Sequence, residues 1–358
     1  MPTRYILPKN FVTKQLTAGD IVVEISGGSP TQSTGRCTAI TQSLLDRYDS
    51  GMVCTNFCKA IKPKEGYSLF IYYYWQYLYS KGIFFSYENG TTGIKNLDFS
   101  GFIETETILI PPVDKVIAFD DYCKSIFNQI FANGKQNDNL EQQAQAIYHE
   151  RFETVSPNDL PSDWRIVTLG EVATISNKSF NPLKEPEILL EHYSIPAFDE
   201  VRFPVFELST SIKSNKFIID ASCFMISKLN PTTKRVWKPY CLTGNAVCST
   251  EFIVYKAKDK TITDFLYSVI DSNSFSDFMC SHVTGSTGSR QRTTPSDTLS
   301  YELILPSEDE LAEFQSLVSP MYAQIRINAI ENDRLKRLRD SLLPKLMSGE
   351  IDVSTIQL

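Results

Sequence analysis

The sequence predicts an α+β protein in which two tandem α/β domains are linked by two long helices that pair with each other. Its 358 residues exceed what one ordinary hydrophobic core accommodates, which indicates at least two domains. A helical stretch at 119–147 recurs at 314–342 without a gap. Short predicted strands, broken by Gly, Pro and Ser, precede each stretch. Because a repeat constrains architecture more firmly than single-residue propensities do, we expect two similar units.

The two helical stretches are amphipathic and lie 195 positions apart. Along the first, nine residues are spaced alternately four and three positions apart, as in a coiled-coil seam. They are Phe119, Cys123, Ile126, Ile130, Asn133, Asn137, Leu140, Ala144 and Ile147. The matching places in the second stretch hold Phe314, Val318, Met321, Ile325, Asn328, Asn332, Leu335, Arg339 and Leu342. Arg339 therefore places a charge in the second seam.

Two asparagines occupy the same seam places in both stretches. Most amphipathic helices pack on their own domain, and that alternative stays open. Buried Asn lowers the stability of an apolar seam but fixes its register, so the matching pairs favour helix pairing. The residues expected to pair the helices are Ile126, Ile130, Asn133, Asn137, Leu140, Met321, Ile325, Asn328, Asn332 and Leu335.

Composition limits the function. A formal net charge of −7 argues against gripping nucleic acid by bulk electrostatics, although local basic patches remain compatible with it. No run of about 18 apolar residues is present, and residues 1–10 lack the layout of a secretion signal. Eight cysteines without regular spacing fit a reducing compartment. We therefore expect a cytoplasmic protein, and with only three histidines we expect no metal site.

The first domain is predicted at 1–118. Residues 20–26 read as a strand, and 27–35 as the turn after it, because the turn lacks the Gly-Lys-Ser/Thr ending of a nucleotide-binding loop. The aromatic stretch 67–79 has the composition of a base-stacking surface, but such stretches are more often buried, and we interpret it as core.

Loops with matching glycines occur at 89–96 and 284–291, which implies a backbone shape that side chains would obstruct. A strand is predicted after each loop, ending at Pro111 or Pro306.

The remaining chain divides into a central spacer helix at 119–152, a linker at 153–163, a second domain at 164–306, a C-terminal spacer helix at 307–347 and a tail at 348–358. In the second domain, strands are predicted at 223–227 and 247–255. Between them lies the basic loop 228–238 around Trp237. This loop is either a nucleic-acid contact or a solvated loop anchored by Trp237. At an offset of 195 the first unit would begin before residue 1, so we expect its first domain to be N-terminally incomplete.

Four segments together resemble the specificity subunit of type I restriction-modification systems: 161–172 (PSDWRIVTLGEV), the block from KLNP at 228–231 to CSTEF at 248–252, the GSTG loop at 285–288, and 342–351 (LLPKLMSGEI). The resemblance covers the second unit in full and the first from about Phe11 onward. It implies two target-recognition domains, each reading one half of a split double-stranded DNA site. It also implies that the two helices form an antiparallel coiled coil, which acts as a ruler and docks partner subunits.

The resemblance implies a chain that is not an enzyme and binds no cofactor. S-adenosylmethionine is expected in the partner modification (methyltransferase) subunits, which methylate adenine, and a restriction subunit is a further expected partner. The sequence at 110–113, IPPV, is not the Asp/Asn-Pro-Pro-aromatic motif of an amino-methyltransferase. Arg and Lys suit guanine edges or phosphates, and Asn and Gln suit adenine. The candidate DNA-binding residues are Lys228, Lys234, Arg235, Lys238, Arg290, Gln291 and Arg292 in the second domain, and Arg36, Lys95 and Asn96 in the first.

Two other interpretations stay open. Paired helices carrying two α/β domains also suit a protein-interaction scaffold, which the acidic charge favours slightly. The incomplete first domain also suits a non-functional recombination fragment of a specificity subunit, or a start codon placed too far downstream.

The length of the spacer helix generates a testable prediction. The 29 residues of 119–147, at about 1.5 Å per residue, span roughly 43 Å. At about 3.4 Å per base pair, this equals on the order of 13 base pairs of DNA. Inserting one helical turn into both helices is expected to lengthen the spacer of the recognised site. Sequencing of methylated adenines checks this, and an unchanged spacer contradicts the ruler.

Overall fold

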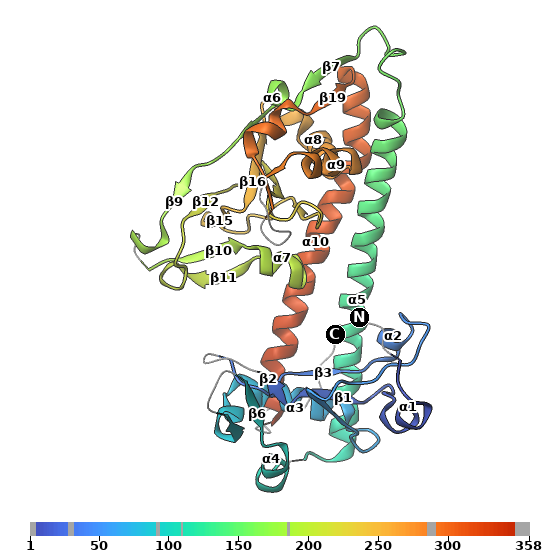
Figure 1. The fold of residues 1–358 in the computed structure, drawn as a ribbon, viewed down its shortest axis with the longest axis vertical. Helices are drawn as coiled ribbons and strands as arrows, with labels where there is room; N and C mark the ends of the chain where they lie inside the picture. Colours follow the sequence, from blue (N-terminus) through green and yellow to red (C-terminus); the bar gives the residue numbers. More distant parts are fainter. Residues whose placement is uncertain are drawn as a thin grey trace. The chain divides into compact units, whose positions relative to one another are not determined.

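The computed structural model describes residues 5–27, 32–90, 94–108, 110–184, 187–284 and 291–347. The chain forms two compact units, one of residues 1–130 with 334–358 and the other of residues 131–333. The predicted α+β fold with two long helices is confirmed (Figure 1). Helix α5 (Val113–Tyr148) and helix α10 (Glu308–Met347) each contribute to both units, so the unit boundary falls inside the helices. None of the described helices is apolar over a length that would cross a bilayer.

Helix α5 begins earlier than predicted, directly after Pro111 and Pro112, and it continues into a π-helical turn, η2 (His149–Glu153). Proline is tolerated at the start of a helix, where its missing N–H group would have no helical partner. In the first unit, Phe119 and Cys123 of α5 pack against helix α3, while Tyr122 and Ile126 pack against Leu335 of α10. Packing on the domain and pairing of the helices, which were alternatives at the level of sequence, therefore both occur.

In the second unit the helices pair through amides. Asn133 Nδ2 donates to Asn332 Oδ1 at 2.9 Å, and Asn328 Nδ2 donates to Asn137 Oδ1 at 2.8 Å. Numbers fall along one helix as they rise along the other, so the helices run antiparallel. The two bonds are equivalent in the repeat, because Asn133 corresponds to Asn328 and Asn332 corresponds to Asn137 at an offset of 195 positions. The repeat therefore extends to individual hydrogen bonds. Asn133 and Asn328 are buried, so their amides would cost stability if these bonds were lost.

Arg339, the charged place in the second seam, lies among aromatic rings of the first unit. Its guanidinium carbon is 5.7 Å from the ring centroid of Tyr73 and 5.8 Å from that of Phe127, within the range of cation–π attraction. Its Nε also donates to Asp340 at 2.7 Å. These contacts explain how the seam accommodates a charge.

The first unit is built on an antiparallel sheet with strand β1 (Ile21–Glu24) between β3 (Cys37–Ala39) and β4 (Cys58–Ile61). Helix α3 (Ser68–Ser80) covers this sheet and buries Phe70, Tyr73, Trp75 and Leu78, which confirms that the aromatic stretch is core. A second small sheet has the order β2 (Ser26–Gly27), β6 (Lys95–Leu97), β5 (Glu88–Asn89). The remaining elements are α1 (Pro8–Lys14), α2 (Gln42–Leu45), η1 (Ile83–Tyr87) and α4 (Phe99–Thr105).

The second unit contains two larger sheets. One has the order β14 (Val236–Trp237), β13 (Cys223–Ser227), β16 (Phe252–Ala257), β8 (Ala173–Ile175), all antiparallel. The other has the order β11 (Val205–Leu208), β10 (Leu189–Tyr193), β15 (Ala246–Ser249), β12 (Lys216–Ile218), β9 (Ser179–Phe180). Strand β7 (Arg165–Thr168) pairs with β19 (Glu302–Leu305), and β17 (Val283–Thr284) with β18 (Arg292–Thr293). The helices are α6 (Leu169–Val172), α7 (Ile195–Val201), α8 (Thr263–Ile270) and α9 (Asn273–Ser281), with short turns η3 (Pro182–Lys184), η4 (Ser209–Ser211), η5 (Lys260–Ile262) and η6 (Pro295–Ser300).

Two strand predictions are wrong. The single strand predicted at 247–255 is two strands, β15 and β16, which belong to different sheets and are separated by a turn at Thr250 and Glu251. The strand predicted before Pro111 is absent from the described residues 106–108 and 110. Its counterpart in the second unit, β19, is a strand that pairs with β7, whereas no strand among the described residues pairs with this segment of the first unit.

The amide pair of Asn137 and Asn328 generates a prediction. In a double-mutant cycle of Asn137→Ala and Asn328→Ala, we expect a coupling energy of about 1 kcal/mol, because Asn137→Ala leaves the buried amide of Asn328 short of a partner. Urea unfolding measures the four free energies. The control is the exposed amide bond from Gln143 Nε2 to Asn139 Oδ1, also 2.8 Å long, which is expected to show coupling near zero. Equal coupling in both cycles would contradict a role of burial.

Asp120 generates a second prediction. Its side chain is buried on α5 and accepts the backbone N–H of Phe70 in the first turn of α3, and burial raises its pKa to about 6. A folded-state pKa above the unfolded value means that stability is full at low pH and is lost as the pH rises through about 6. Asp120→Asn is expected to stabilise the protein at pH 7.5 by on the order of 1 kcal/mol, and progressively less toward pH 4.

Thermal unfolding at several pH values checks this prediction. The control is Asp121→Asn at the neighbouring exposed carboxylate, which is expected to leave stability unchanged. A pH-independent gain for Asp120→Asn would contradict the titration of this buried group.

Candidate nucleic-acid interface

Three predicted DNA-binding residues of the second unit, Lys228, Gln291 and Arg292, lie together. Backbone hydrogen bonds join the start of the basic loop to β18: Asn230 donates to the carbonyl of Gln291 at 2.9 Å, and Thr293 donates to that of Lys228 at 3.1 Å. Lys228 N–H donates to the carbonyl of Glu251 at 2.9 Å. We call Lys228, Asn230, Glu251, Gln291 and Arg292 the Arg292 cluster. Arg290 lies outside the described residues.

The Arg292 cluster is organised by a bidentate ion pair. Arg292 Nε lies 3.0 Å from Glu251 Oε2, and Arg292 Nη2 lies 3.0 Å from Glu251 Oε1. The hydrogen bond from Arg292 lowers the pKa of Glu251, and the charge of Lys228 acts in the same direction. The Arg292 side chain is 42% exposed, so it remains accessible from solvent while its orientation is fixed. A guanidinium held in one plane suits the paired acceptors on the edge of guanine.

The other cations of the basic loop are held elsewhere in the unit. Arg235 forms a bidentate pair with Asp199, with N–O distances of 2.6 and 2.9 Å. Lys238 bonds to Asp264 of α8, and its Nζ lies 5.2 Å from the ring centroid of Tyr322 on α10. These two residues do not join the Arg292 cluster.

Trp237 anchors this part of the loop. Its side chain is buried, with ring centroids 4.7 Å from Tyr193 and 5.4 Å from Phe198. Arg235 and Lys238 flank an anchored segment of the loop, so the loop is not one continuous basic surface.

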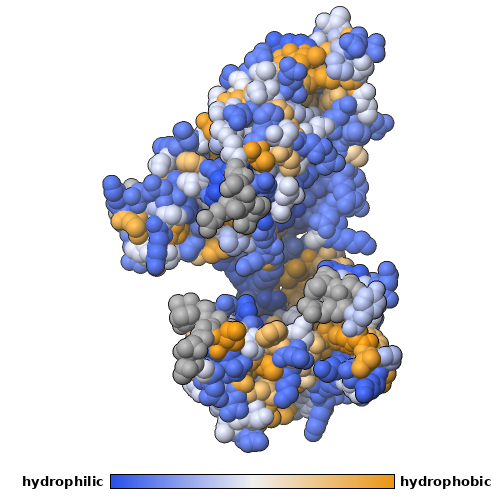
Figure 2. Space-filling view, viewed as in Figure 1, coloured by the Kyte–Doolittle hydropathy of each residue, from blue (hydrophilic) through white to orange (hydrophobic). Residues whose placement is uncertain are grey.

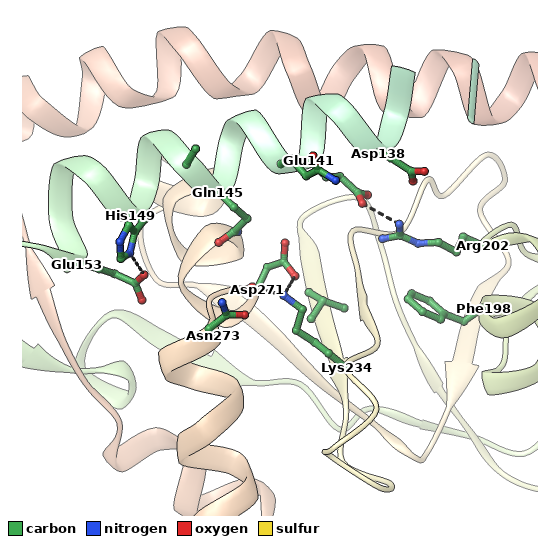
Figure 3. A pocket seen from close by; sticks show the side chains of 13 residues that line it. Asp138, Glu141, Gln145, His149, Glu153, Phe198, Arg202, Lys234, Asp271 and Asn273 are labelled. Atoms are coloured by element: carbon green, nitrogen blue, oxygen red, sulfur yellow. Dashed lines mark hydrogen bonds and ion pairs between the residues drawn. The ribbon is translucent and has the colours of Figure 1, made fainter. Parts of the chain in front are cut away.

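Lys234 lines a pocket of about 680 Å³ between α5 and the loops of the second unit (Figure 3). Its Nζ donates to the backbone carbonyl of Asp271 at 2.6 Å and lies 3.1 Å from the Asp271 carboxylate. Arg202 donates to Glu141 of α5 at 2.8 Å across the same pocket. Burial raises the pKa of Asp271, and the nearby Lys234 opposes that shift.

No local pattern in the sequence indicates this pocket, because the residues that line it come from distant segments. Its carboxylates are Asp138, Glu141, Glu153 and Asp271. They outnumber Arg202 and Lys234, so the pocket disfavours a phosphate backbone.

The first unit also has a cation held by a glutamate beside a hairpin, although the 195-residue shift does not match these residues to Arg292 and Glu251. Lys95, at the start of β6, donates to Glu88 of β5 at 2.6 Å, and the backbone N–H of Thr34 donates to the same carboxylate at 2.6 Å. Burial alone would raise the pKa of Glu88, but the bonds from Lys95 and Thr34 outweigh burial and lower it. Both hairpins, β5–β6 and β17–β18, have tips outside the described residues, at 91–93 and 285–290.

The other two candidates of the first unit are Arg36, directly before β3, and Asn96 on β6. Arg36 forms a bidentate pair with Glu24 of β1, with N–O distances of 2.9 and 2.6 Å. Asn96 is exposed on the central strand β6, where it is in register with Ser26 on one side and Asn89 on the other.

Sequence reasoning missed the carboxylates that hold these cations. Glu24, Glu88 and Glu251 lie from 7 to 41 positions from their partners, so no local spacing reveals them. The acidic net charge was the one available signal. Among the described residues, no group of His, Cys, Asp and Glu side chains is arranged to hold a metal ion.

Known proteins resemble the chain as follows. No protein-family model matches it. It is 24% identical over 262 residues to the type I restriction enzyme MjaIX specificity subunit of Methanocaldococcus jannaschii, covering 65% of this chain and 58% of the relative. It is 33% identical over 93 residues to the type I restriction enzyme HindI specificity subunit of Haemophilus influenzae, covering 26% of this chain and 20% of the relative. The chain thus spans less than two thirds of each relative.

Solved structures show weaker similarity. The S subunit of a type I restriction-modification system from M. genitalium has a TM-score of 0.45 at 15% identity, covering 93% of this chain and 84% of that one. The HsdS subunit from Thermoanaerobacter tengcongensis has a TM-score of 0.33 at 14% identity, with coverage of 94% and 82%. These scores are too low to carry an argument about this chain. The curated relatives, in contrast, are both type I restriction enzyme specificity subunits.

Proposed function

We propose that this chain is the DNA-binding specificity subunit of a type I restriction-modification complex. The observation that carries the proposal is the repeat in the two long helices, which pair through asparagine hydrogen bonds that the 195-position shift relates to each other. Each unit also has a cation held by a glutamate beside a hairpin, at positions that are not equivalent in the repeat. The naming of both curated relatives as specificity subunits supports it. Each unit would read one half of a bipartite double-stranded DNA site.

The Arg292 cluster provides the chemistry for reading bases in the second unit. Arg292 suits guanine, the amide of Gln291 suits adenine, and Lys228 suits a phosphate. Glu251 orients Arg292 before DNA arrives and lowers its attraction for arbitrary phosphates, because its own negative charge repels them. In the first unit, Lys95 with Glu88, Arg36 with Glu24, and Asn96 would act in the same way.

The chain's partners in this proposal carry the catalysis. Modification subunits would bind S-adenosylmethionine and methylate adenine, and a restriction subunit would join them, while this chain supplies no catalytic group or cofactor. Helix α5 exposes Ile117 and Phe131, and α10 exposes Leu317 and Ile327. Exposed apolar side chains on long helices suit protein docking. The assembled complex would act in the cytoplasm.

A protein-interaction scaffold without a DNA role is the second candidate. One observation favours it: six of the ten predicted DNA-binding residues, all of them cations, are paired with carboxylates, namely Lys234, Arg235, Lys238, Arg292, Arg36 and Lys95. Reconstitution of this chain with its modification subunits separates the two candidates. A specificity subunit makes the complex methylate a defined DNA site, whereas a scaffold without a DNA role gives no defined site.

The Glu251–Arg292 pair generates the central prediction. Sequencing of methylated adenines first identifies the preferred site of the reconstituted complex. Arg292→Ala is then expected to weaken binding to that site by about 1–3 kcal/mol, because a bidentate base contact is lost. Lys228→Ala is expected to weaken binding to all duplexes equally and to reduce the salt dependence. Glu251→Gln is expected to raise the affinity for unrelated DNA and so to lower discrimination.

Arg235→Ala is the matched control for these variants. It removes an arginine of the same loop whose guanidinium is bound to the exposed carboxylate of Asp199, so we expect unchanged DNA affinity. Undiminished site preference in Arg292→Ala would remove the Arg292 cluster from the interface.

A further inference from the structure

A second, smaller cavity of the second unit, about 180 Å³ in volume, plays no part in the proposed reading of DNA. Residues of α5, α8, α10 and the loop after β14 line it, among them Glu141, Tyr240, Tyr267, Tyr322 and Arg326. Figure 2 shows that the visible face of the second unit is mostly hydrophilic, whereas this cavity is walled by aromatic rings. A cavity of about 150 Å³ is enough for benzene, so this one has room for a ring with a substituent.

The hydroxyl group of Tyr267 is a buried polar group in the wall of this cavity. Tyr267 is 5% exposed, and among the described residues no group forms a hydrogen bond with its hydroxyl. The ring of Tyr322 lies 5.0 Å away, but its hydroxyl bonds to Ser268 at 2.8 Å. Burial raises the pKa of Tyr267, so its hydroxyl stays protonated and can donate. A buried hydroxyl without a partner is unfavourable, and a ligand that accepts its proton removes this cost.

The charged groups around the cavity include one more cation than carboxylates. Arg202 donates to Glu141 at 2.8 Å, and Lys238 bonds to Asp264. Arg326 has no carboxylate partner among the described residues, and its Nε and Nη2 donate to one backbone carbonyl at 3.4 and 3.3 Å. Such long bonds to a neutral acceptor leave this guanidinium able to bind an anion. A surplus of one positive charge suits a monoanionic carboxylate better than a phosphate ester, which carries about two negative charges.

The backbone beside the cavity adopts a conformation that side chains rarely adopt. Arg202 ends α7 with a φ of 50°, at a position where glycine is the usual residue. Cys241, which follows Tyr240 of the cavity wall, has a φ of 45°. Backbone strain of this kind is concentrated at binding and active sites, which supports a binding role for the cavity.

We propose that this cavity binds a small planar carboxylate, with its ring against the aromatic walls and its carboxylate held by Arg326 and the hydroxyl of Tyr267. Apolar and aromatic walls with a few polar groups are typical of small-molecule sites, and a guanidinium pairs with a carboxylate through two parallel bonds. Because its walls come from α5, α8 and α10, the ligand contacts the domain and both helices at once. Its binding therefore stabilises their packing in the second unit. The site shares no residue with the Arg292 cluster.

Isothermal titration calorimetry of the 358-residue chain with benzoate tests the proposal. Saturable one-to-one binding is expected, together with a rise in the unfolding temperature as benzoate is added. Benzamide has nearly the same shape without the charge, and it is expected to bind at least about tenfold more weakly. Phenyl phosphate is expected to bind more weakly than benzoate, because its second negative charge has no cation to balance it.

Two substitutions locate the site. Tyr267→Phe breaks no hydrogen bond within the described chain, so it is expected to preserve the unfolding temperature without ligand and to weaken benzoate binding severalfold. Arg326→Gln is expected to weaken it about tenfold. The matched control is Arg165→Gln, which removes an exposed arginine of β7 outside the cavity lining and is expected to leave benzoate binding unchanged.

Four outcomes each overturn the proposal. They are the absence of saturable benzoate binding, equal affinity for benzoate and benzamide, tighter binding of phenyl phosphate than of benzoate, and equal weakening by Arg326→Gln and Arg165→Gln.

Discussion

Two hydrogen bonds, each made by one buried and one partly buried asparagine amide, set the register on which the second unit depends. Asn133 with Asn332 and Asn328 with Asn137 cannot both form if either helix slides by one residue. The resulting register places Phe314 against Tyr148, Phe152 and Phe265, and Tyr322 against Ser268, with its hydroxyl 2.8 Å from Ser268 Oγ. The helices are therefore part of the domain core, and the polar seam determines how that core closes.

The ion pairs of the second unit differ in how deeply their carboxylates are buried. The Arg292–Glu251 pair is half exposed, and pairs of that kind contribute about 0–1 kcal/mol, so exchanging the partner for a nucleotide has a small cost. Lys234 and Lys238 instead bind Asp271 and Asp264, whose side chains are largely buried. Breaking these pairs would leave a buried carboxylate without its cation, which is strongly unfavourable. The basic loop thus carries structural cations at one end and an adaptable cluster at the other.

The sequence correctly predicted the elements that depend on residues close together in the chain. The spacing of four and three identified both helices, and the density of aromatic residues identified 67–79 as core, which the structure shows to be helix α3. Strand predictions were wrong where the structure depends on pairing with strands that lie far away in the sequence. A continuous apolar run at 247–255 does not reveal a change of sheet at Glu251, and Leu305 lies in a strand only because β7 reaches it. The carboxylates at the candidate interface were invisible for the same reason, since their pairing is created by the fold.

The repeated amide bond has a genetic consequence. Since shifting one bond by 195 positions reproduces the other, a chain in which the segments 119–147 and 314–342 exchanged places would retain the same two asparagine pairs. Crossing over between the two copies therefore preserves the register of the helices while it replaces the domain attached to them. A unit attached to the helices can therefore be exchanged without loss of the asparagine bonds that hold the two helices together.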